Sequence, residues 1–276
     1  MALHESSGNK LSAVTFISAA DRLPVVEVCL ETLKFADEII VVSHHAPPPL
    51  ISLAKKYTKQ IFPCDSDDFS VRHNLGREKA SGNWLLYVDC DERVSVKLAG
   101  QIKDSLNYPS AGAYQLRRVN YYLGKESIFG DRYPDFVTRL FKKDKLVGWE
   151  GEIHESSKVS GKIGKLDAPL YHLTHRDIFS MTAKTTNFAG HEASLRYRAG
   201  HPPVVWWRLI RVFVTELYTR LVKYQGWRQG TEGWIDGMFQ AFSLFIVYAR
   251  LWELQRRPTL EQTYLDIDRK ITAGEI

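Results

Sequence analysis

The chain has 276 residues, of which 44% are hydrophobic and 25% are charged. This balance is that of an ordinary globular protein, and it excludes a disordered, collagen-like or coiled-coil chain. Lysine and arginine (37) exceed aspartate and glutamate (32), which permits binding to phosphates, nucleic acid or an anionic membrane but selects none of them. Three cysteines are too few for a disulfide scaffold and favour a reducing compartment.

Neither a signal peptide nor a membrane-spanning helix is expected. Residues 11–20 are apolar, but a single lysine precedes them and a second strand-like segment follows, as in an α/β domain. The longest uncharged run near the C-terminus covers residues 237–249, which is shorter than the roughly 20 residues that span a bilayer. Residues 11–18 are therefore interpreted as a strand.

Strands and helices alternate in the first part of the chain. Runs of β-branched and apolar residues predict buried strands at 11–18, 38–42, 60–63 and 84–88. Apolar residues at helical spacing predict helices at 23–33, 50–57, 70–80 and 94–106. The proline-rich stretch between the second strand and second helix is expected to be a loop. This order predicts parallel strands with helices on both faces, and ligands bind beyond the carboxyl ends of such strands.

The rest of the chain changes character twice. Residues 113–171 are strand-like and aromatic, with glycines that mark turns, and the pattern becomes helical from about residue 177. We therefore expect an α/β domain over residues 1–176 and a helical region over residues 177–276.

Two carboxylates follow the strand expected at 84–88. Asp89 and Asp91 are two residues apart, so in an extended chain both side chains face one pocket. Oxygen ligands suit Mg²⁺ or Mn²⁺, which keep bound waters and bridge to substrate phosphates. Alternatively, one of the aspartates caps the helix expected at 94–106. Cys90 lies between them and is expected to point into the core as an inert thiol.

The segment around these aspartates resembles the nucleotide-sugar glycosyltransferases of family 2. Residues 72–92 share with that family an Arg-x-Asn helix start, an Ala-x-Gly-x-Trp turn, a hydrophobic strand and a D-x-D-E end. Segments similar to the family's first helix and second strand lie at residues 29–33 and 36–42. Segments similar to the branch that adds sugars to lipopolysaccharide core lie at residues 139–141, 151–155, 170–172 and 226–233.

This resemblance implies a GT-A fold, a Rossmann-like and mostly parallel sheet, and an inverting transfer reaction. Asp91, helped by Asp89, would hold the divalent metal that bridges the donor diphosphate. Glu155 matches the position of the base that deprotonates the acceptor hydroxyl, with Glu152 as the second candidate. The alternative for Glu155 is a surface position on a polar loop. His172 would be a further metal ligand or a phosphate contact.

Four further residues become candidate donor contacts through the resemblance: Asp21, Arg72, Asn74 and Arg139. An arginine at a helix start can equally be solvated, and a lone histidine is more often structural, so those alternatives stay open. His44 and His45 are interpreted as loop residues because no third metal ligand has suitable spacing.

Two loops depart from the family pattern. Residues 20–21 are Ala-Asp where the family has Asn-Glu, and residues 43–49 replace an Asp-Ser-Gly-Ser-Thr-Asp-like turn. In the family these loops hold the base and the ribose, and Asp21 would partly replace the missing acid. A degenerate member that binds a glycan or a partner transferase without catalysis is therefore an alternative. The retained aspartates and Glu155 argue against it.

The C-terminal region is basic and aromatic. Residues 204–223 predict a helix with polar residues on one stripe and tryptophans on its other faces, and residues 184–228 hold eight basic and two acidic side chains. This pattern suits the headgroup zone of an anionic membrane. A second helix is expected at 231–255. Alternatively, both helices pack on the catalytic domain or form a homodimer contact. No nucleic-acid-binding motif is present, so nucleic acid is not an expected partner.

The sequence and its resemblance together predict a metal-dependent inverting glycosyltransferase. It would move a sugar from a nucleotide-sugar donor, a UDP-sugar for preference, to a glycan or lipid-linked acceptor in cell-envelope polysaccharide or lipopolysaccharide synthesis. Its expected location is cytoplasmic, peripheral at the inner face of the cytoplasmic membrane. Transfer to a polyprenyl phosphate is the alternative within the enzyme class, with the basic aromatic C-terminus holding the lipid phosphate.

Overall fold

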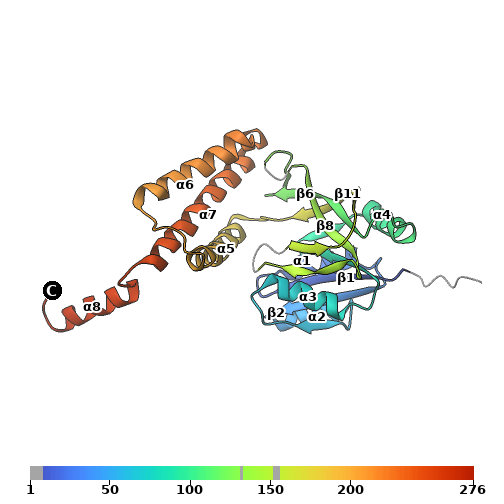
Figure 1. Ribbon diagram of the computed structural model, residues 1–276, viewed down its shortest axis with the longest axis horizontal. Helices are drawn as coiled ribbons and strands as arrows, with labels where there is room; N and C mark the ends of the chain where they lie inside the picture. Colours follow the sequence, from blue (N-terminus) through green and yellow to red (C-terminus); the bar gives the residue numbers. More distant parts are fainter. Residues whose placement is uncertain (1–8, 131–132, 152–155) are drawn as a thin grey trace, which may run out of the picture. The chain divides into compact units, whose positions relative to one another are not determined.

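The computed structural model describes residues 9–130, 133–151 and 156–276. These residues form two compact units (Figure 1). The first, here called the sheet unit, comprises Met1–Glu126 and Pro134–Thr174, and the second, the helical unit, comprises Ser127–Tyr133 and His175–Ile276. The short segment Ser127–Tyr133 thus belongs to the helical unit, although in the sequence it lies between the two segments of the sheet unit.

The sheet unit is built on one mixed sheet whose strands are mostly parallel. Its parallel half has the order β3-β2-β1-β4 and consists of β1 (Leu11–Ser18), β2 (Glu38–His44), β3 (Ile61–Pro63) and β4 (Trp84–Val88). The order continues from β4 through β8 (Asp135–Lys142), β6 (Ala113–Tyr122) and β11 (Ile163–Leu173) to β5 (Glu92–Val94). In this second half β8 and β5 run antiparallel to their neighbours. The predicted mostly parallel α/β sheet is confirmed.

Two smaller strand pairs complete the sheet unit. β7 (Lys125–Glu126) extends β6, and a separate antiparallel ribbon consists of β9 (Leu146–Glu150) and β10 (Ser156–Val159). The four helices are α1 (Leu23–Thr32), α2 (Pro48–Ala54), α3 (Phe69–Lys79) and α4 (Val96–Asn107).

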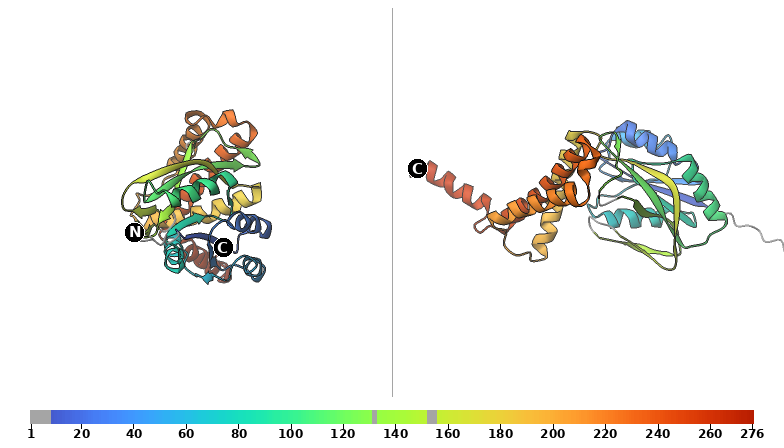
Figure 2. Two further views of the ribbon diagram at one scale, coloured as in Figure 1. Left: turned by 90° about the vertical axis from the view of Figure 1, so that its right-hand side faces the viewer. Right: turned by 90° about the horizontal axis from the view of Figure 1, so that it is seen from above.

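Helices cover both faces of the sheet, as predicted (Figures 1 and 2). One core contains Leu30 of α1, Leu50 of α2 and Leu98 of α4 together with alternate residues of the strands. The opposite core joins the other strand residues to α3 and β9 through Leu75 and Trp149. Because side chains of a strand alternate between faces, a sheet covered on both sides needs continuous apolar runs such as those of β2 and β4.

Two local expectations were wrong. α4 begins at Val96, and the side chain of Ser95 caps it by accepting a hydrogen bond from the N–H of Leu98 (3.1 Å), so neither Asp89 nor Asp91 caps this helix. The reason is that β5 intervenes and pairs with β11. α2 begins at Pro48 rather than at residue 50, because proline fits the first turn of a helix, where no N–H is needed.

The helical unit contains four α-helices: α5 (Ile178–Arg198), α6 (Trp206–Tyr218), α7 (Thr231–Gln255) and α8 (Leu260–Thr272). A π-helical turn, η1 (Thr219–Lys223), continues α6, and a 3₁₀ turn, η2 (Gly226–Gln229), precedes α7. α7 packs against both α5 and α6, and Ala193, Val204 and Val247 belong to its small core. None of the helices in the described parts of the chain combines the length and the apolar composition needed to cross a lipid bilayer.

A buried carboxylate ties together the amino ends of the parallel strands. Glu38, the first residue of β2, accepts hydrogen bonds from the side chain of Ser12, from Gln60 Nε2 (3.0 Å) and from the N–H and Oγ of Ser81 (both 2.6 Å). Burial alone would raise the pKa of Glu38, but the hydrogen bonds from Ser12, Ser81 and Gln60 outweigh it and lower the pKa to about 2. Gly82 completes this turn, since a Cβ there would lie 2.5 Å from the carbonyl oxygen of Lys10.

We predict that Glu38→Gln destabilises the protein by about 1–3 kcal/mol at neutral pH, because a neutral amide replaces a carboxylate that accepts several buried hydrogen bonds. The folded-state pKa lies below the unfolded value, so the stabilisation is present above about pH 4.5 and is lost as the pH falls toward 2. Urea unfolding at a series of pH values should therefore show a flatter acid limb for Glu38→Gln. The exposed Glu27 provides the matched control, Glu27→Gln, which should keep the wild-type acid limb.

Candidate active site

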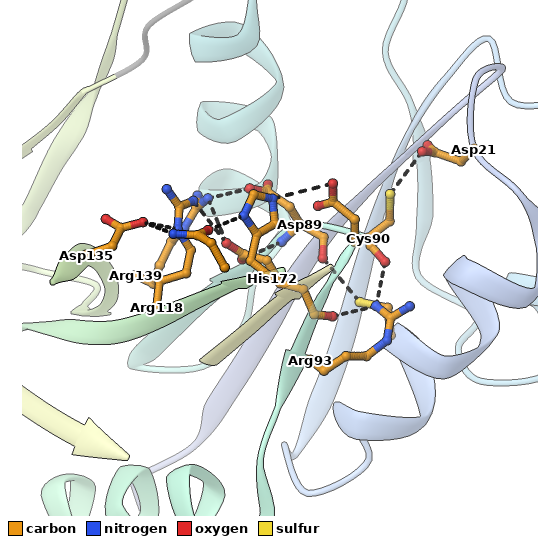
Figure 3. Close-up of polar contacts among 12 residues, drawn as sticks. Asp21, Asp89, Cys90, Arg93, Arg118, Asp135, Arg139 and His172 are labelled. Carbon is orange, nitrogen blue, oxygen red and sulfur yellow. Dashed lines mark hydrogen bonds and ion pairs between the residues drawn. The ribbon is translucent and has the colours of Figure 1, made fainter. Parts of the chain in front are cut away.

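The site lies at the carboxyl end of β4, where the chain turns. The N–H of Glu92 donates to the carbonyl oxygen of Asp89 (2.9 Å), so residues 89–92 form a tight turn rather than an extended strand. The extended chain expected at Asp89 and Asp91 was therefore wrong, and the shared pocket expected for their side chains stays a prediction. The carboxylate of Asp89 contacts Arg139 (Figure 3). The carboxylate of Asp91 faces His172.

One half of the site surrounds the fully buried carboxylate of Glu92. Its Oε2 accepts the N–H of Asp89 (3.0 Å), and its Oε1 lies 3.4 Å from Arg118 Nη1 and 3.5 Å from Arg139 Nη2. Burial raises the pKa of Glu92, and the positive charge of Arg139 opposes this effect. Arg139, on β8, also forms an ion pair with Asp89. Arg139, which is buried, links Glu92 to Asp89, and Arg118, which is partly buried, links Glu92 to Asp135.

The other half of the site connects Asp135 to Asp91. Asp135 Oδ2 accepts hydrogen bonds from Arg118 Nε (2.7 Å) and from Asn120 Nδ2 (2.9 Å). Asn120 Oδ1 lies 2.7 Å from His172 Nδ1, and His172 Nε2 lies 3.5 Å from Asp91 Oδ2. The amide nitrogen of Asn120 donates to Asp135, so it is the amide oxygen of Asn120 that faces His172. An amide oxygen can only accept a hydrogen bond, and therefore Nδ1 of His172 carries the proton that it donates to Asn120.

The tautomer of His172 determines which kind of atom faces Asp91. In neutral His172 the Nε2 lone pair points toward a carboxylate oxygen, and two acceptors face each other across 3.5 Å. Such an arrangement needs a positive group between them, which is either a proton on Nε2 or a bound cation. Both side chains are partly exposed, so a ligand can reach them from solvent.

The turn itself is anchored from two sides. Arg93 donates to the carbonyl oxygens of Cys90 (2.7 Å) and Val25 (2.7 Å), which ties the turn to α1. The thiol of Cys90 donates to Asp21 Oδ1 (3.0 Å), while Asp21 Oδ2 accepts the N–H of Ser18 (2.6 Å). Burial raises the pKa of the Cys90 thiol well above its ordinary value, so it stays protonated and donates to Asp21 instead of only filling the core.

The two residues predicted at the start of α3 lie in different surroundings. Arg72 donates from Nε to the carbonyl oxygen of Ser66 (2.7 Å) and lies over the ring of Phe69. Asn74 exchanges two 3.0 Å hydrogen bonds with the backbone of Trp149 and so joins α3 to β9. These contacts give Asn74 a structural role, and its predicted contact with a donor stays a prediction.

One of the two loops expected to hold a nucleotide, residues 43–49, has histidine–carboxylate contacts at its start. His44, the last residue of β2, has Nε2 3.3 Å from Asp67 Oδ1, and His45 has Nδ1 3.7 Å from Asp65 Oδ1. Arg72 Nη2 lies 3.9 Å from the same oxygen of Asp67. The two candidate bases, Glu152 and Glu155, lie outside the described residues.

Sequence reasoning missed four residues that shape the site: Arg93, Arg118, Asn120 and Asp135. Arg118 and Asn120 did carry a signal, because they are two apart on β6 and therefore share one face of a buried sheet. Polar side chains at both positions of such a face require partners, and here Asp135 serves both.

A divalent cation fits the Asp91–His172 pair. Within the ranges the structure describes, no three His, Cys, Asp or Glu side chains are close enough to enclose a metal ion. Mg²⁺ and Mn²⁺ need no such cage, since they bind through one or two protein ligands and take the rest from water and substrate phosphates. Asp91 and His172 would supply two such ligands, whereas Asp89 is held by Arg139.

Comparisons with known proteins agree with this architecture. No protein-family model matches the chain. An uncharacterized glycosyltransferase of Rickettsia bellii is 23% identical over 269 residues, covering 89% of this chain and 87% of the relative. An uncharacterized glycosyltransferase of Rickettsia typhi is 21% identical over 262 residues, covering 87% and 86%.

Among solved structures, the mannosyltransferase PcManGT from Pyrobaculum calidifontis, in complex with GDP-Man and Mn²⁺, superposes with a TM-score of 0.50 at 11% identity. The superposition covers 90% of this chain and 88% of that one. The fold is GT-A. The predicted fold class is thereby confirmed, and the likeness extends beyond the sheet unit, since it covers most of the chain.

We predict that Glu92→Gln lowers the free energy of unfolding by roughly 3 kcal/mol, because it leaves the buried Arg139 and the partly buried Arg118 with one negative partner fewer and turns an amide donor toward them. Urea denaturation measures this loss. Glu78→Gln is the matched control, because Glu78 forms only an exposed pair with Lys79, and its unfolding midpoint should stay at the wild-type value. Equal effects of the two substitutions would contradict the buried cluster.

We also predict that Asn120→Leu changes the tautomer of His172. The acceptor for Nδ1–H is removed, so the proton moves to Nε2, where Asp91 can accept it. Imidazole ¹⁵N chemical shifts of the neutral ring, measured at about pH 8, distinguish the two tautomers. His44 is the internal reference, because its Nδ1 contacts the carbonyl oxygen of Cys64 (3.0 Å) in both proteins. An unchanged His172 spectrum would refute the role of Asn120.

Proposed function

We propose that this chain is a glycosyltransferase that takes its sugar from a nucleotide-sugar donor. The GT-A fold and the glycosyltransferase relatives support the reaction class. The observation that carries the proposal is the opposed pair of Asp91 and His172, 3.5 Å apart beyond the carboxyl end of β4. Ligands of open α/β sheets bind at this end of the strands, and a carboxylate beside an imidazole there suits the divalent cation that accompanies a donor diphosphate.

Asp91 and His172 would hold Mn²⁺ or Mg²⁺ together with the donor. The metal supplies Lewis-acid stabilisation of the charge that develops on the departing nucleotide diphosphate. Asn120 fixes the ring of His172 so that Nε2 faces the ligand, and Arg139 holds Asp89 so that the turn keeps its shape. Asp21, at the end of β1, and Arg72, beside His44 and Asp67, are the proposed contacts to the donor nucleotide.

The proposed reaction inverts the anomeric centre, with Glu155 as the base. A carboxylate within reach of the acceptor hydroxyl takes its proton as the oxygen attacks the anomeric carbon, and the nucleotide diphosphate leaves on the opposite side. The proposed acceptor is a glycan or a lipid-linked sugar at a membrane surface, as in cell-envelope polysaccharide or lipopolysaccharide synthesis. This assignment of Glu155 rests on the family resemblance of residues 151–155.

The donor site is tested by thermal unfolding with UDP, GDP and CMP and their sugars, with and without Mn²⁺. We predict that one nucleotide raises the melting temperature of the wild type only when Mn²⁺ is present. A ligand at 100 times its dissociation constant adds about 2.7 kcal/mol to the folded state, which is a shift of several degrees for a chain of this length. Asp91→Asn should abolish the shift, because it removes one of the two proposed metal ligands.

Asp104→Asn, an exposed substitution on α4, is the matched control and should keep the shift. A metal-dependent shift that survives in Asp91→Asn would place the donor elsewhere. No shift with any nucleotide would instead favour the non-catalytic alternative.

We further predict that Glu155→Gln separates binding from chemistry. Loss of a general base lowers the turnover number by about 10²–10⁴-fold, while the Mn²⁺-dependent thermal shift with the nucleotide stays intact because Asp91 and His172 are untouched. The release of nucleoside diphosphate from the sugar donor measures turnover. Glu152→Gln serves as the comparison, and a larger loss of turnover there than in Glu155→Gln would reassign the base.

A further inference from the structure

The tryptophans of this chain are distributed unevenly between its two units. Of the seven, Trp84 and Trp149 belong to the sheet unit and are 0% and 6% exposed. The other five belong to the helical unit, and each is at least 42% exposed: Trp206, Trp207, Trp227, Trp234 and Trp252. Tryptophan is the largest apolar side chain and is ordinarily well buried, except where one side is apolar and the other is wet. The helical unit therefore presents a surface of that kind.

The exposed apolar side chains of α6 and η1 form one continuous stripe. This outer stripe consists of Trp206, Trp207, Ile210, Val214, Tyr218 and Val222, all exposed. The spacing of three and four residues places them on a single side of the helix. Val212 and Leu221 form the buried side of the same segment. The segment therefore has two apolar sides, of which one packs within the helical unit and the other, the outer stripe, is exposed. α7 repeats the pattern with Trp234, Met238 and Phe242.

Cations accompany the aromatic rings of this surface. The guanidinium groups of Arg208 and Arg211 lie 5.7 and 5.5 Å from the ring centre of Trp207, and Lys223 lies 5.4 Å from that of Tyr224. Arg211 and Lys223 are exposed beside the outer stripe. An apolar protein partner would bury these charges at a cost, whereas phosphate groups of lipids would pair with them.

We propose that the outer stripe of α6 and η1 binds the surface of an anionic lipid bilayer. The rings and aliphatic side chains enter the boundary between headgroups and acyl chains, and Arg211 and Lys223 contact lipid phosphates. Binding of this kind needs no membrane-spanning helix and is independent of the transfer chemistry of the sheet unit. Its loss and the loss of donor binding are therefore separate results.

The test is co-sedimentation of the full-length chain with vesicles at about 50 mM NaCl, where surface charges are weakly screened. Vesicles of phosphatidylcholine alone are compared with vesicles that contain about 30 mol% phosphatidylglycerol. We expect the wild type to bind the anionic vesicles and to be released by about 500 mM NaCl. The triple substitution Trp206→Gln, Ile210→Gln, Val214→Gln should lower the partition coefficient at least tenfold. The double substitution Arg211→Gln, Lys223→Gln should lower the partition coefficient severalfold and make binding less dependent on the salt concentration.

Matched controls lie on the sheet unit. Val96 and Tyr108 are even more exposed than most of the stripe, and Lys97 and Lys103 are exposed cations on α4. Val96→Gln with Tyr108→Gln, and Lys97→Gln with Lys103→Gln, should leave vesicle binding unchanged. Circular dichroism and the Mn²⁺–nucleotide thermal shift show that each variant is folded.

Three outcomes overturn the proposal. The first is a wild type that does not bind anionic vesicles, and the second is a triple variant that binds them as the wild type does. The third is a dimer, measured by light scattering, that the triple substitution converts to a monomer while vesicles bind neither protein. That result would assign the outer stripe to a second copy of this chain.

Discussion

The carboxylate of Glu92 is fully buried, and the site depends on the positive groups that surround it. Those groups come from β6 and β8, which enter the sheet beyond β4. If β8 were absent from its place beside β4, Arg139 would reach neither Glu92 nor Asp89. The insertion of the antiparallel strand β8 between β4 and β6 is therefore what lets the turn after β4 bury a charge, so the polar site depends on the order of the strands.

Most of the parallel half could be predicted from the sequence. β1 and β4 were predicted at the residues where they occur, because both are short apolar runs bounded by turn residues and buried on both faces. β5 could not be predicted in the same way. It has three residues, too few to show a period, and it exists because Glu92–Val94 pairs with β11, which follows much later in the chain. Ser95 then becomes the cap of α4, a role that the alternative interpretation of the sequence gave to one of the two aspartates.

Several individual residues of the site could be predicted from the sequence, but the contacts between them could not. Asp91 and His172 each follow or end an apolar strand, so both were candidate ligands, and the structure brings them together. Asp89 and Arg139 were also candidates, but their mutual ion pair was not predicted because fifty residues separate them. Asp135 has no local signature, and the signal at Asn120, two residues after Arg118, does not reveal that Asn120 pairs with Asp135. Their importance lies in the hydrogen bonds by which one orients the other, and these exist only after β6 and β8 have paired.

The polar contacts of the site also bear on how the chain folds. They form a continuous series that runs from Asp89 through Arg139, Glu92, Arg118, Asp135, Asn120 and His172 to Asp91. A nascent chain that has emerged only through α4 already contains Glu92, yet it lacks both arginines that neutralise it. Burial of that carboxylate must wait for strands that are synthesised tens of residues later. We therefore expect the turn to close late, after the opposite end of the sheet, where Glu38 pairs with Ser12 and Ser81, because the chain contains both of these partners before either arginine.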